Sequence, residues 1–146
     1  MSGFGPNRRV VHNAGMGCAE AVIDIQASPK DVLEFVMDLR RYRQADHKVG
    51  PVLWLRRTGN RADAVACGKV FGVVTPPGLI SIELTPYTRL DVRSRIPGFS
   101  AFFECEDLGG GVTRVRHCEC LVGPFAHLLS ESVLEELERM KALFES

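Results

Sequence analysis

The sequence predicts an α+β domain in which an antiparallel sheet of about seven strands packs against one long C-terminal helix. Three observations support this class. Apolar side chains recur at helical spacing over residues 124–146, short alternating runs separated by turn residues fill residues 52–122, and a strand followed by a capped helix precedes them. A helix with an apolar stripe has to bury that stripe, so the strands must provide the surface that it covers.

Composition limits the classes of function. The chain has 146 residues, enough for one domain with a sizeable core. Its 18 basic and 18 acidic residues give no net charge, whereas a protein that binds nucleic acid without regard to sequence needs a basic surface. No run reaches the roughly 18 apolar residues of a membrane-spanning helix, and Arg8–Arg9 is not followed by the apolar region of an export signal. We therefore expect no nucleic-acid partner and no transmembrane segment.

The five cysteines, at positions 18, 67, 105, 118 and 120, form no CxxC motif and no paired metal-ligand spacing. We expect all five to be reduced thiols, which places the protein in a reducing compartment, the cytoplasm. Cys118 and Cys120 would point to the same side of a strand, but alternation sends His117 to the opposite side. The sequence therefore predicts no metal site, and it indicates no cofactor.

The N-terminal region predicts a leader and then the start of the domain. Residues 1–17 contain four glycines and a proline and show little periodicity, so we expect a flexible leader before a domain at 18–146. The run Ala19–Ala27 predicts the first strand. Ser28 then caps a helix that begins with Pro29, where the missing N–H does no harm.

Residues 40–48 are polar and predict a second short helix or a turn, which we expect to end at Gly50-Pro51. Within this segment Asp46 and His47 are either a pair at the mouth of a cavity or part of a solvated turn. Breaks between the later strands are expected at Thr58-Gly59-Asn60, Pro76-Pro77-Gly78, Pro86, Pro97-Gly98 and Gly109-Gly110-Gly111. Their spacing of about ten residues predicts consecutive antiparallel strands.

The segment 124–146 predicts one helix with a wide apolar stripe. The stripe consists of Phe125, Leu129, Val133, Leu137, Met140 and Phe144, widened by Leu128 and Leu143. Pro124 suits the first turn of this helix. A start at Ser132 is also open, since Ser132 and Glu135 spell a capping box.

The register of the last strands follows from charge and from the turns. A glycine loop that pairs Leu108 with Val112 places glutamates opposite arginines on the solvent side of the sheet. The pairs expected there are Glu106–Arg114 and Glu104–Arg116, and those on the core side are Cys105–Val115, Phe103–His117 and Ala101–Glu119. A turn at Pro97-Gly98 is expected to pair Val92 with Phe103 and Ser94 with Ala101.

This register places His117 and Glu119 on the side that the terminal helix should cover. Charged groups are rarely buried without a partner or water. Two interpretations stay open. The two side chains satisfy one another, or the sheet encloses a partly wet cavity in which they orient the polar group of a ligand.

Three segments resemble the START-like (SRPBCC) superfamily, and within it the bacterial polyketide cyclase/dehydrase-like group. They are residues 28–36 (Ser-Pro-Lys-Asp-Val-Leu-Glu-Phe-Val), 38–42 (Asp-Leu-Arg-Arg-Tyr) and 110–115 (Gly-Gly-Val-Thr-Arg-Val). The resemblance covers residues 19–146 and rests on element order and loose motifs. It implies a helix-grip fold, in which a strongly curved antiparallel sheet wraps the C-terminal helix and leaves a cavity between them.

The resemblance also implies binding of a hydrophobic small molecule such as a lipid, a quinone or a polyketide, or catalysis of cyclisation or dehydration. For a binding cavity we expect a lining of Val92, Ser94, Phe103, Val115, His117, Glu119, Leu129, Val133 and Leu137. For catalysis, His117 and Glu119 are the candidate acid and base, although the family has no universal catalytic residue. A third interpretation is a protein-interaction module that uses residues 40–48.

Overall fold

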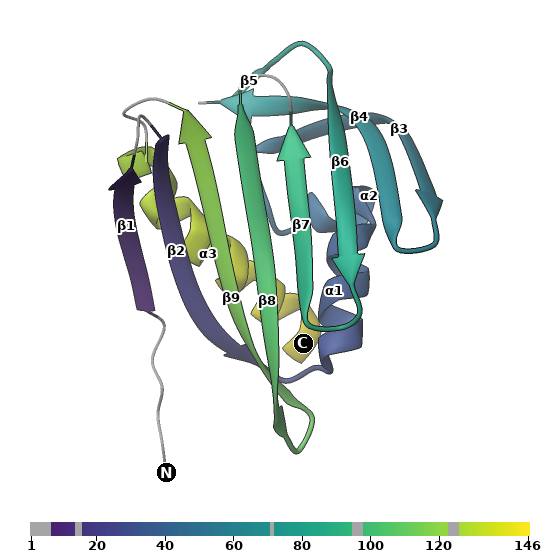
Figure 1. Cartoon of the computed structure of the whole chain (residues 1–146), viewed down its shortest axis with the longest axis vertical. Helices are drawn as coiled ribbons and strands as arrows, with labels where there is room; N and C mark the ends of the chain where they lie inside the picture. Colours follow the sequence, from purple (N-terminus) through teal and green to yellow (C-terminus); the bar gives the residue numbers. More distant parts are fainter. Residues whose placement is uncertain (1–6, 14–15, 71, 95–97, 123–125) are drawn as a thin grey trace.

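In the computed structural model of the chain, the described residues are 7–13, 16–70, 72–94, 98–122 and 126–146. The elements along the chain are β1 (Asn7–Asn13), β2 (Met16–Ile25), α1 (Pro29–Met37), α2 (Leu39–Tyr42), β3 (Val49–Thr58), β4 (Arg61–Val70), β5 (Val73–Val74), β6 (Gly78–Thr85), β7 (Arg89–Ser94), β8 (Phe99–Gly109), β9 (Val112–Val122) and α3 (Ala126–Glu145). Figure 1 shows a curved sheet with α3 running along one face and with α1 and α2 beside it. The predicted α+β class and the helix-grip arrangement are confirmed.

The sheet is antiparallel, with the strand order β1-β2-β9-β8-β7-β6-β4-β3, and β5 pairs with β4. Within the expected leader, residues 7–13 form β1, which pairs with β2 from Asn7 opposite Val22 to Asn13 opposite Met16. The edge of β2 presents backbone N–H and C=O groups, which form hydrogen bonds with an added strand. The amino-acid composition of residues 1–17 does not predict this pairing. The sheet therefore has more strands than the seven expected.

The segment after β2 follows the predicted cap. The backbone N–H of Asp31 donates to Ser28 Oγ at 3.1 Å, so α1 begins where the sequence indicates. The second short helix is also confirmed as α2. Gly50-Pro51 does not end the segment, however, because both residues lie inside β3. A Cβ at Gly50 would lie 2.9 Å from the carbonyl oxygen of Gly68, and β3 is the edge strand, where Pro51 is tolerated.

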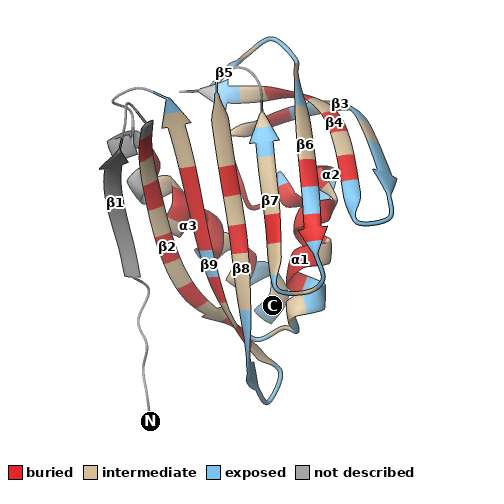
Figure 2. Ribbon diagram, viewed as in Figure 1, coloured by how far each residue is buried: buried red, intermediate tan, exposed pale blue. Residues whose placement is uncertain are grey.

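The C-terminal helix α3 begins at Ala126, so the alternative start at Ser132 is wrong. Pro124 lies outside the described residues. The apolar stripe is buried where the structure describes its central part, at Leu129, Val133, Leu137 and Met140. Burial alternates residue by residue along β2, and the core fills the space between the concave face of the sheet and the helices (Figure 2).

The predicted register of β8 and β9 is confirmed for all five pairs from Ala101–Glu119 to Glu106–Arg114. At the turn the expectation is wrong, because Val112 pairs with Gly109 and a bulge takes up Leu108. Between β7 and β8 the register differs by two residues from the one expected. The observed pairs are Leu90–Phe103, Val92–Ala101 and Ser94–Phe99. The turn signal does not fix which residues flank the turn, so it does not determine the register. Because side chains alternate with a period of two, a shift of two residues keeps each side chain on its predicted face.

A disulfide joins Cys18 to Cys120, so the expectation of five reduced thiols is wrong. The two residues are direct partners on β2 and β9, with Cα atoms 4.1 Å apart and 102 positions between them in sequence. Spacing along the chain cannot reveal such a pair. The cytoplasmic location was inferred from five reduced thiols, so the disulfide removes the basis for that inference. No helix in the described part of the chain is long and apolar enough to cross a membrane.

Candidate functional site

A buried polar cluster lies where β9, α3 and the segment after α2 meet. Its members are Tyr42, Asp46, Lys48, His117, Glu119, Ser132 and Glu136. The side chains of His117 and Glu119 are 1% exposed and that of Glu136 is fully buried. Ionisable groups are almost never buried to this degree unless they are paired, so the cluster is either structural or functional.

Strand alternation and helix packing bring the cluster together. On β9, His117 and Glu119 point to the concave face, as the sequence predicts. On α3, Glu136 stands inside the apolar stripe, three residues after Val133 and four before Met140, and therefore faces the sheet. The sequence analysis did not identify Glu136, although a lone glutamate inside an apolar helix stripe is a usable signal.

Glu136 is the centre of the hydrogen-bond network. Tyr42 donates its hydroxyl to Glu136 Oε2 at 2.7 Å, and His117 Nε2 lies 2.9 Å from the same oxygen. Ser132 Oγ at 3.2 Å and Lys48 Nζ donate to Oε1. Burial alone would raise the pKa of Glu136, but the charges of Lys48 and His117 and the bonds they donate lower that pKa well below its ordinary value. Glu136 is therefore an ionised carboxylate with all its acceptor positions used.

His117 is held by partners on both ring nitrogens. Its Nδ1 lies 3.0 Å from the carbonyl oxygen of Phe102, which can only accept, so Nδ1 carries a proton. Its Nε2 lies 2.9 Å from the carboxylate oxygen Oε2 of Glu136, so both ring nitrogens lie against acceptors. The ring stacks on Phe103 at 3.9 Å between centroids. His117 and Glu119 do not satisfy one another, since Nε2 is 3.8 Å from Glu119 Oε2 and 2.9 Å from Glu136.

Lys48 uses all three of its ammonium protons. They go to Asp46 Oδ1 at 3.0 Å, to Ser132 Oγ at 2.7 Å and to Glu136 Oε1. Burial alone would lower the pKa of Lys48, but the surrounding carboxyl groups of Glu119, Asp46 and Glu136 raise it. Lys48 is therefore a fixed cation with no proton left for a further acceptor.

Glu119 is the member that this network leaves incomplete. Its Oε1 forms an ion pair with Lys48 Nζ at 3.2 Å, but it has no hydrogen-bond partner among the described residues. Burial and then the negative charge of Glu136 raise the pKa of Glu119 well above its ordinary value. Glu119 therefore holds its proton more tightly than an ordinary glutamate does, and its Oε1 is unsatisfied.

An interior cavity of about 70 Å³ adjoins the cluster. Of the predicted lining residues, Val92, Ser94, Phe103, His117 and Glu119 line it. Val115, Leu129, Val133 and Leu137 do not line it and are packed in the core instead. The apolar stripe of α3 fills the space against the sheet, so the cavity lies towards α1 and α2. Their side chains Val36, Leu39 and Tyr42 line it and were missed, because the sequence does not show which helix leaves a gap.

Asp46 and His47 separate in the structure. Asp46 is 4% exposed, lines the cavity and accepts from the backbone N–H and the ammonium group of Lys48. His47 is exposed. Only Asp46 therefore belongs to the site, and the expected pair is not formed.

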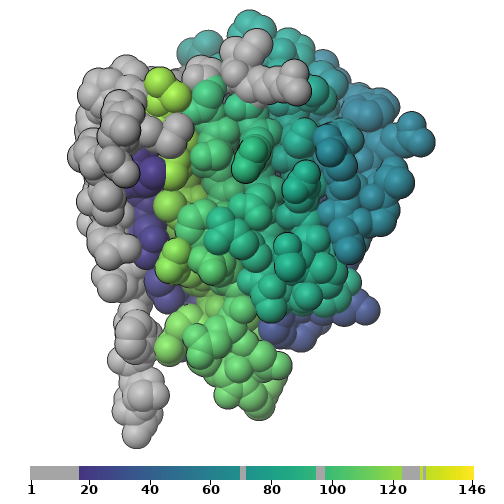
Figure 3. Space-filling model, in the orientation of Figure 1, coloured from purple at the N-terminus to yellow at the C-terminus, as the bar shows by residue number. Residues whose placement is uncertain are grey.

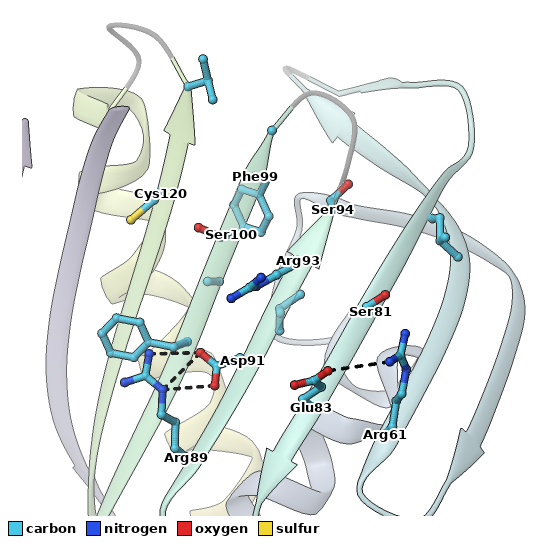
Figure 4. A pocket seen from close by; sticks show the side chains of 16 residues that line it. Arg61, Ser81, Glu83, Arg89, Asp91, Arg93, Ser94, Phe99, Ser100 and Cys120 are labelled. Carbon is cyan, nitrogen blue, oxygen red and sulfur yellow. Dashed lines mark hydrogen bonds and ion pairs between the residues drawn. The ribbon is translucent and has the colours of Figure 1, made fainter. Parts of the chain in front are cut away.

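A larger hollow of about 720 Å³ lies on the opposite, convex face of the sheet (Figure 4), the face that Figure 3 displays over β6 to β9. Its charged side chains largely pair with one another. Arg89 Nη2 lies 3.0 Å from Asp91, and Arg61 Nη1 lies 3.8 Å from Glu83. This outer groove is an open strand surface, whereas ligand sites are typically enclosed and apolar with a few polar groups. The interior cavity fits that description better despite its size.

Comparison with known proteins shows the fold. Neither a protein-family model nor a curated protein sequence matches the chain. Among solved structures, a STAR-related lipid transfer protein from Xanthomonas axonopodis matches with a TM-score of 0.72 at 13% identity, over 100% of this chain and 97% of that one. The Zhui aromatase/cyclase from a Streptomyces species matches with a TM-score of 0.61 at 16% identity, over 89% and 88%. The chain has the START-like helix-grip fold.

A START superfamily protein from Mycobacterium smegmatis matches in the same way, with a TM-score of 0.64 at 15% identity over 88% of this chain and 97% of that one. The START-like fold accounts for the curved sheet and for the long helix across it. At these identities it does not transfer a ligand or a reaction, because one fold serves many functions. The function has to be argued from the buried polar cluster and the cavity.

Proposed function

We propose that the protein binds a hydrophobic small molecule, of lipid, quinone or polyketide type, in the interior cavity, where Glu119 hydrogen-bonds a hydroxyl group of the ligand. The observation that carries this proposal is the unsatisfied Oε1 of Glu119, on a side chain that lines a largely apolar cavity. Leaving a buried polar atom without a partner costs about 1–3 kcal/mol. A ligand hydroxyl both donates and accepts, so it can hydrogen-bond the carboxyl group of Glu119 in either protonation state.

The solved structures of this fold support a hydrophobic ligand, since one is named a lipid transfer protein and another an aromatase/cyclase. The cavity of about 70 Å³ is smaller than the roughly 300–1,000 Å³ of pockets for drug-sized ligands, so the ligand has to push its walls apart. The wall opposite the sheet includes Leu39 and Tyr42 of α2, a helix of only 4 residues. We propose that α2 moves outward to enlarge the cavity when the ligand binds.

The proposal is tested by removing the polar group of the proposed hydrogen bond first from the protein and then from the ligand. Glu119→Met keeps the length of the side chain and removes its oxygens. We expect this variant to bind alizarin, a dihydroxyanthraquinone, about tenfold more weakly than the unmodified chain in a calorimetric titration, the equivalent of one hydrogen bond. Its affinity for anthraquinone, which has no hydroxyl group, should not change.

The matched control is Glu106→Met, which alters an exposed glutamate on the outer face of β8 and should leave both affinities unchanged. Native mass spectrometry of the purified chain identifies a co-purified ligand and so its class. A Glu119→Met variant that loses both ligands equally, or neither, would contradict the hydrogen bond. Failure of both probes, together with no co-purified molecule, would contradict binding itself.

The other candidate functions have less support. Acid–base catalysis by the predicted pair would need a free nitrogen on His117, but both ring nitrogens are engaged by Phe102 and Glu136. Glu119 alone remains as a proton donor at the cavity. An interaction module over residues 40–48 would present that segment to solvent, whereas Tyr42 and Asp46 within it are buried.

A further inference from the structure

Three cysteine sulfurs meet on the outer face of the sheet, where β2 pairs with β9. Cys18 and Cys120 form the disulfide, and Cys118 Sγ lies 4.0 Å from Cys120 Sγ. All three sulfur atoms lie within 4.8 Å of one another. The two remaining cysteines, Cys67 on β4 and Cys105 on β8, are outside this group.

The strand geometry explains the meeting. Cys118 and Cys120 are two residues apart on β9, so they share a face, and the register of β2 places Cys18 directly opposite Cys120. That face is the outer one, because His117 and Glu119, which alternate with them, are buried on the concave side. The three cysteines, hereafter the thiol trio, are therefore separate from the cavity and from its polar cluster.

We propose that the thiol trio binds one Cu(I) ion when the Cys18–Cys120 disulfide is reduced. Thiolate ligands select soft ions such as Cu(I). Metal–sulfur bonds of about 2.3 Å in a trigonal plane place the sulfur atoms about 4.0 Å apart, because the separation is the bond length multiplied by √3. The observed 4.0 Å between the sulfurs of Cys118 and Cys120 already equals that separation.

Reduction of the Cys18–Cys120 disulfide is balanced when a dithiol is the reductant. The dithiol supplies two electrons and two protons to the disulfide, which becomes two thiols, and the dithiol itself becomes a disulfide. Cu(I) then displaces the thiol protons to solvent and keeps its oxidation state. Structural zinc sites are almost always four-coordinate, so a site of three thiolates favours Cu(I) over zinc.

The surroundings of the thiol trio provide a nearby positive charge and a route by which an ion can approach. Arg89 lies close enough to Cys118 for its positive charge to act on the thiolate. Cys120 borders the outer groove, Figure 4 shows its sulfur on the side of β9 that faces β2, and Cys18 and Cys120 are both half-buried. An ion can therefore reach Cys120 from the groove, and the sulfur of the buried Cys118 lies 4.0 Å from that of Cys120.

The test uses the full chain, reduced with a dithiol, separated from the dithiol under anaerobic conditions and then titrated with Cu(I) against the chelator bicinchoninate. We expect one Cu(I) per chain. Cys118→Ser should weaken binding by at least about tenfold, since losing even an outer-shell partner of a metal site costs that much. Cys105→Ser, a matched control on β8, should bind as the unmodified chain does. The oxidised unmodified chain should also bind at least about tenfold more weakly, because two of the sulfurs are then in the disulfide.

The comparison of oxidised and reduced chains needs no substitution, so it decides the matter even if Cys118→Ser does not fold. Equal Cu(I) affinity in the two states would overturn the proposal. A Cys105→Ser variant that loses as much affinity as Cys118→Ser would also overturn it, because binding would then not depend on the thiol trio.

Discussion

Glu136→Gln is expected to lower the free energy of unfolding by roughly 3–5 kcal/mol at neutral pH, the usual loss when one partner of a buried ion pair is removed. The substitution keeps the shape of the side chain and removes its charge. Lys48 and His117 both donate to this carboxylate, and an amide has only one oxygen with which to replace its two. The Lys48 ammonium group and the ring of His117 then remain beside a side chain that carries no negative charge. Urea denaturation measures the loss.

The matched control for this result is Glu135→Gln. Glu135 is the preceding residue on the same helix, and its side chain is 59% exposed. Its change in unfolding free energy should stay within about 0.5 kcal/mol, as for most surface substitutions. A Glu136→Gln variant as stable as this control would show that the buried polar cluster does not depend on the carboxylate at its centre.

Glu119 is expected to make the stability of the protein fall as pH rises above about 4.3, the ordinary pKa of a glutamate. The pKa of Glu119 is raised by burial and by the charge of Glu136, so the folded chain keeps a proton that the unfolded chain releases. The contribution of Glu119 to stability is thus complete below pH of about 4.3 and is lost as pH rises towards the folded pKa. The slope is at most about 1.4 kcal/mol per pH unit.

Glu119→Gln isolates this contribution, because glutamine does not titrate. The stability of the variant relative to the unmodified chain should be nearly constant in acid and should increase with each pH unit above about 4.3. Glu136, whose pKa is lowered, acts in the opposite direction and destabilises the fold as pH falls, but it does so in both proteins. Urea denaturation from pH 4 to pH 8 gives the comparison. A stability difference that does not vary with pH would contradict a raised pKa at Glu119.

Local patterns were enough to predict the elements that position the site. The apolar stripe of α3 and the opposite charges on β8 and β9 place His117 and Glu119 on the concave face, and the structure confirms that register. Alternation within a strand is a property of the chain itself. The predicted faces are therefore correct even though the predicted register between β7 and β8 is wrong by two residues.

Features that depend on distant segments were not predictable in the same way. Lys48 reaches Glu136 across 88 positions, and Cys18 meets Cys120 across 102. The position of the cavity depends on how closely α3 and α2 each pack against the sheet. The periodicity of apolar residues does not predict this closeness. Glu136 is the exception, because its place inside the apolar stripe of α3 marks a buried charge in need of partners.

The position of a bound ligand tests the proposed binding function most directly. Leu39 and Ile82 line only the interior cavity, whereas Leu79 and Val122 line only the outer groove. In the complex with alizarin, we predict intermolecular nuclear Overhauser effects from the aromatic protons of the ligand to the methyl groups of Leu39 and Ile82. Such effects to Leu79 and Val122 instead, with none to Leu39 or Ile82, would contradict binding in the interior cavity.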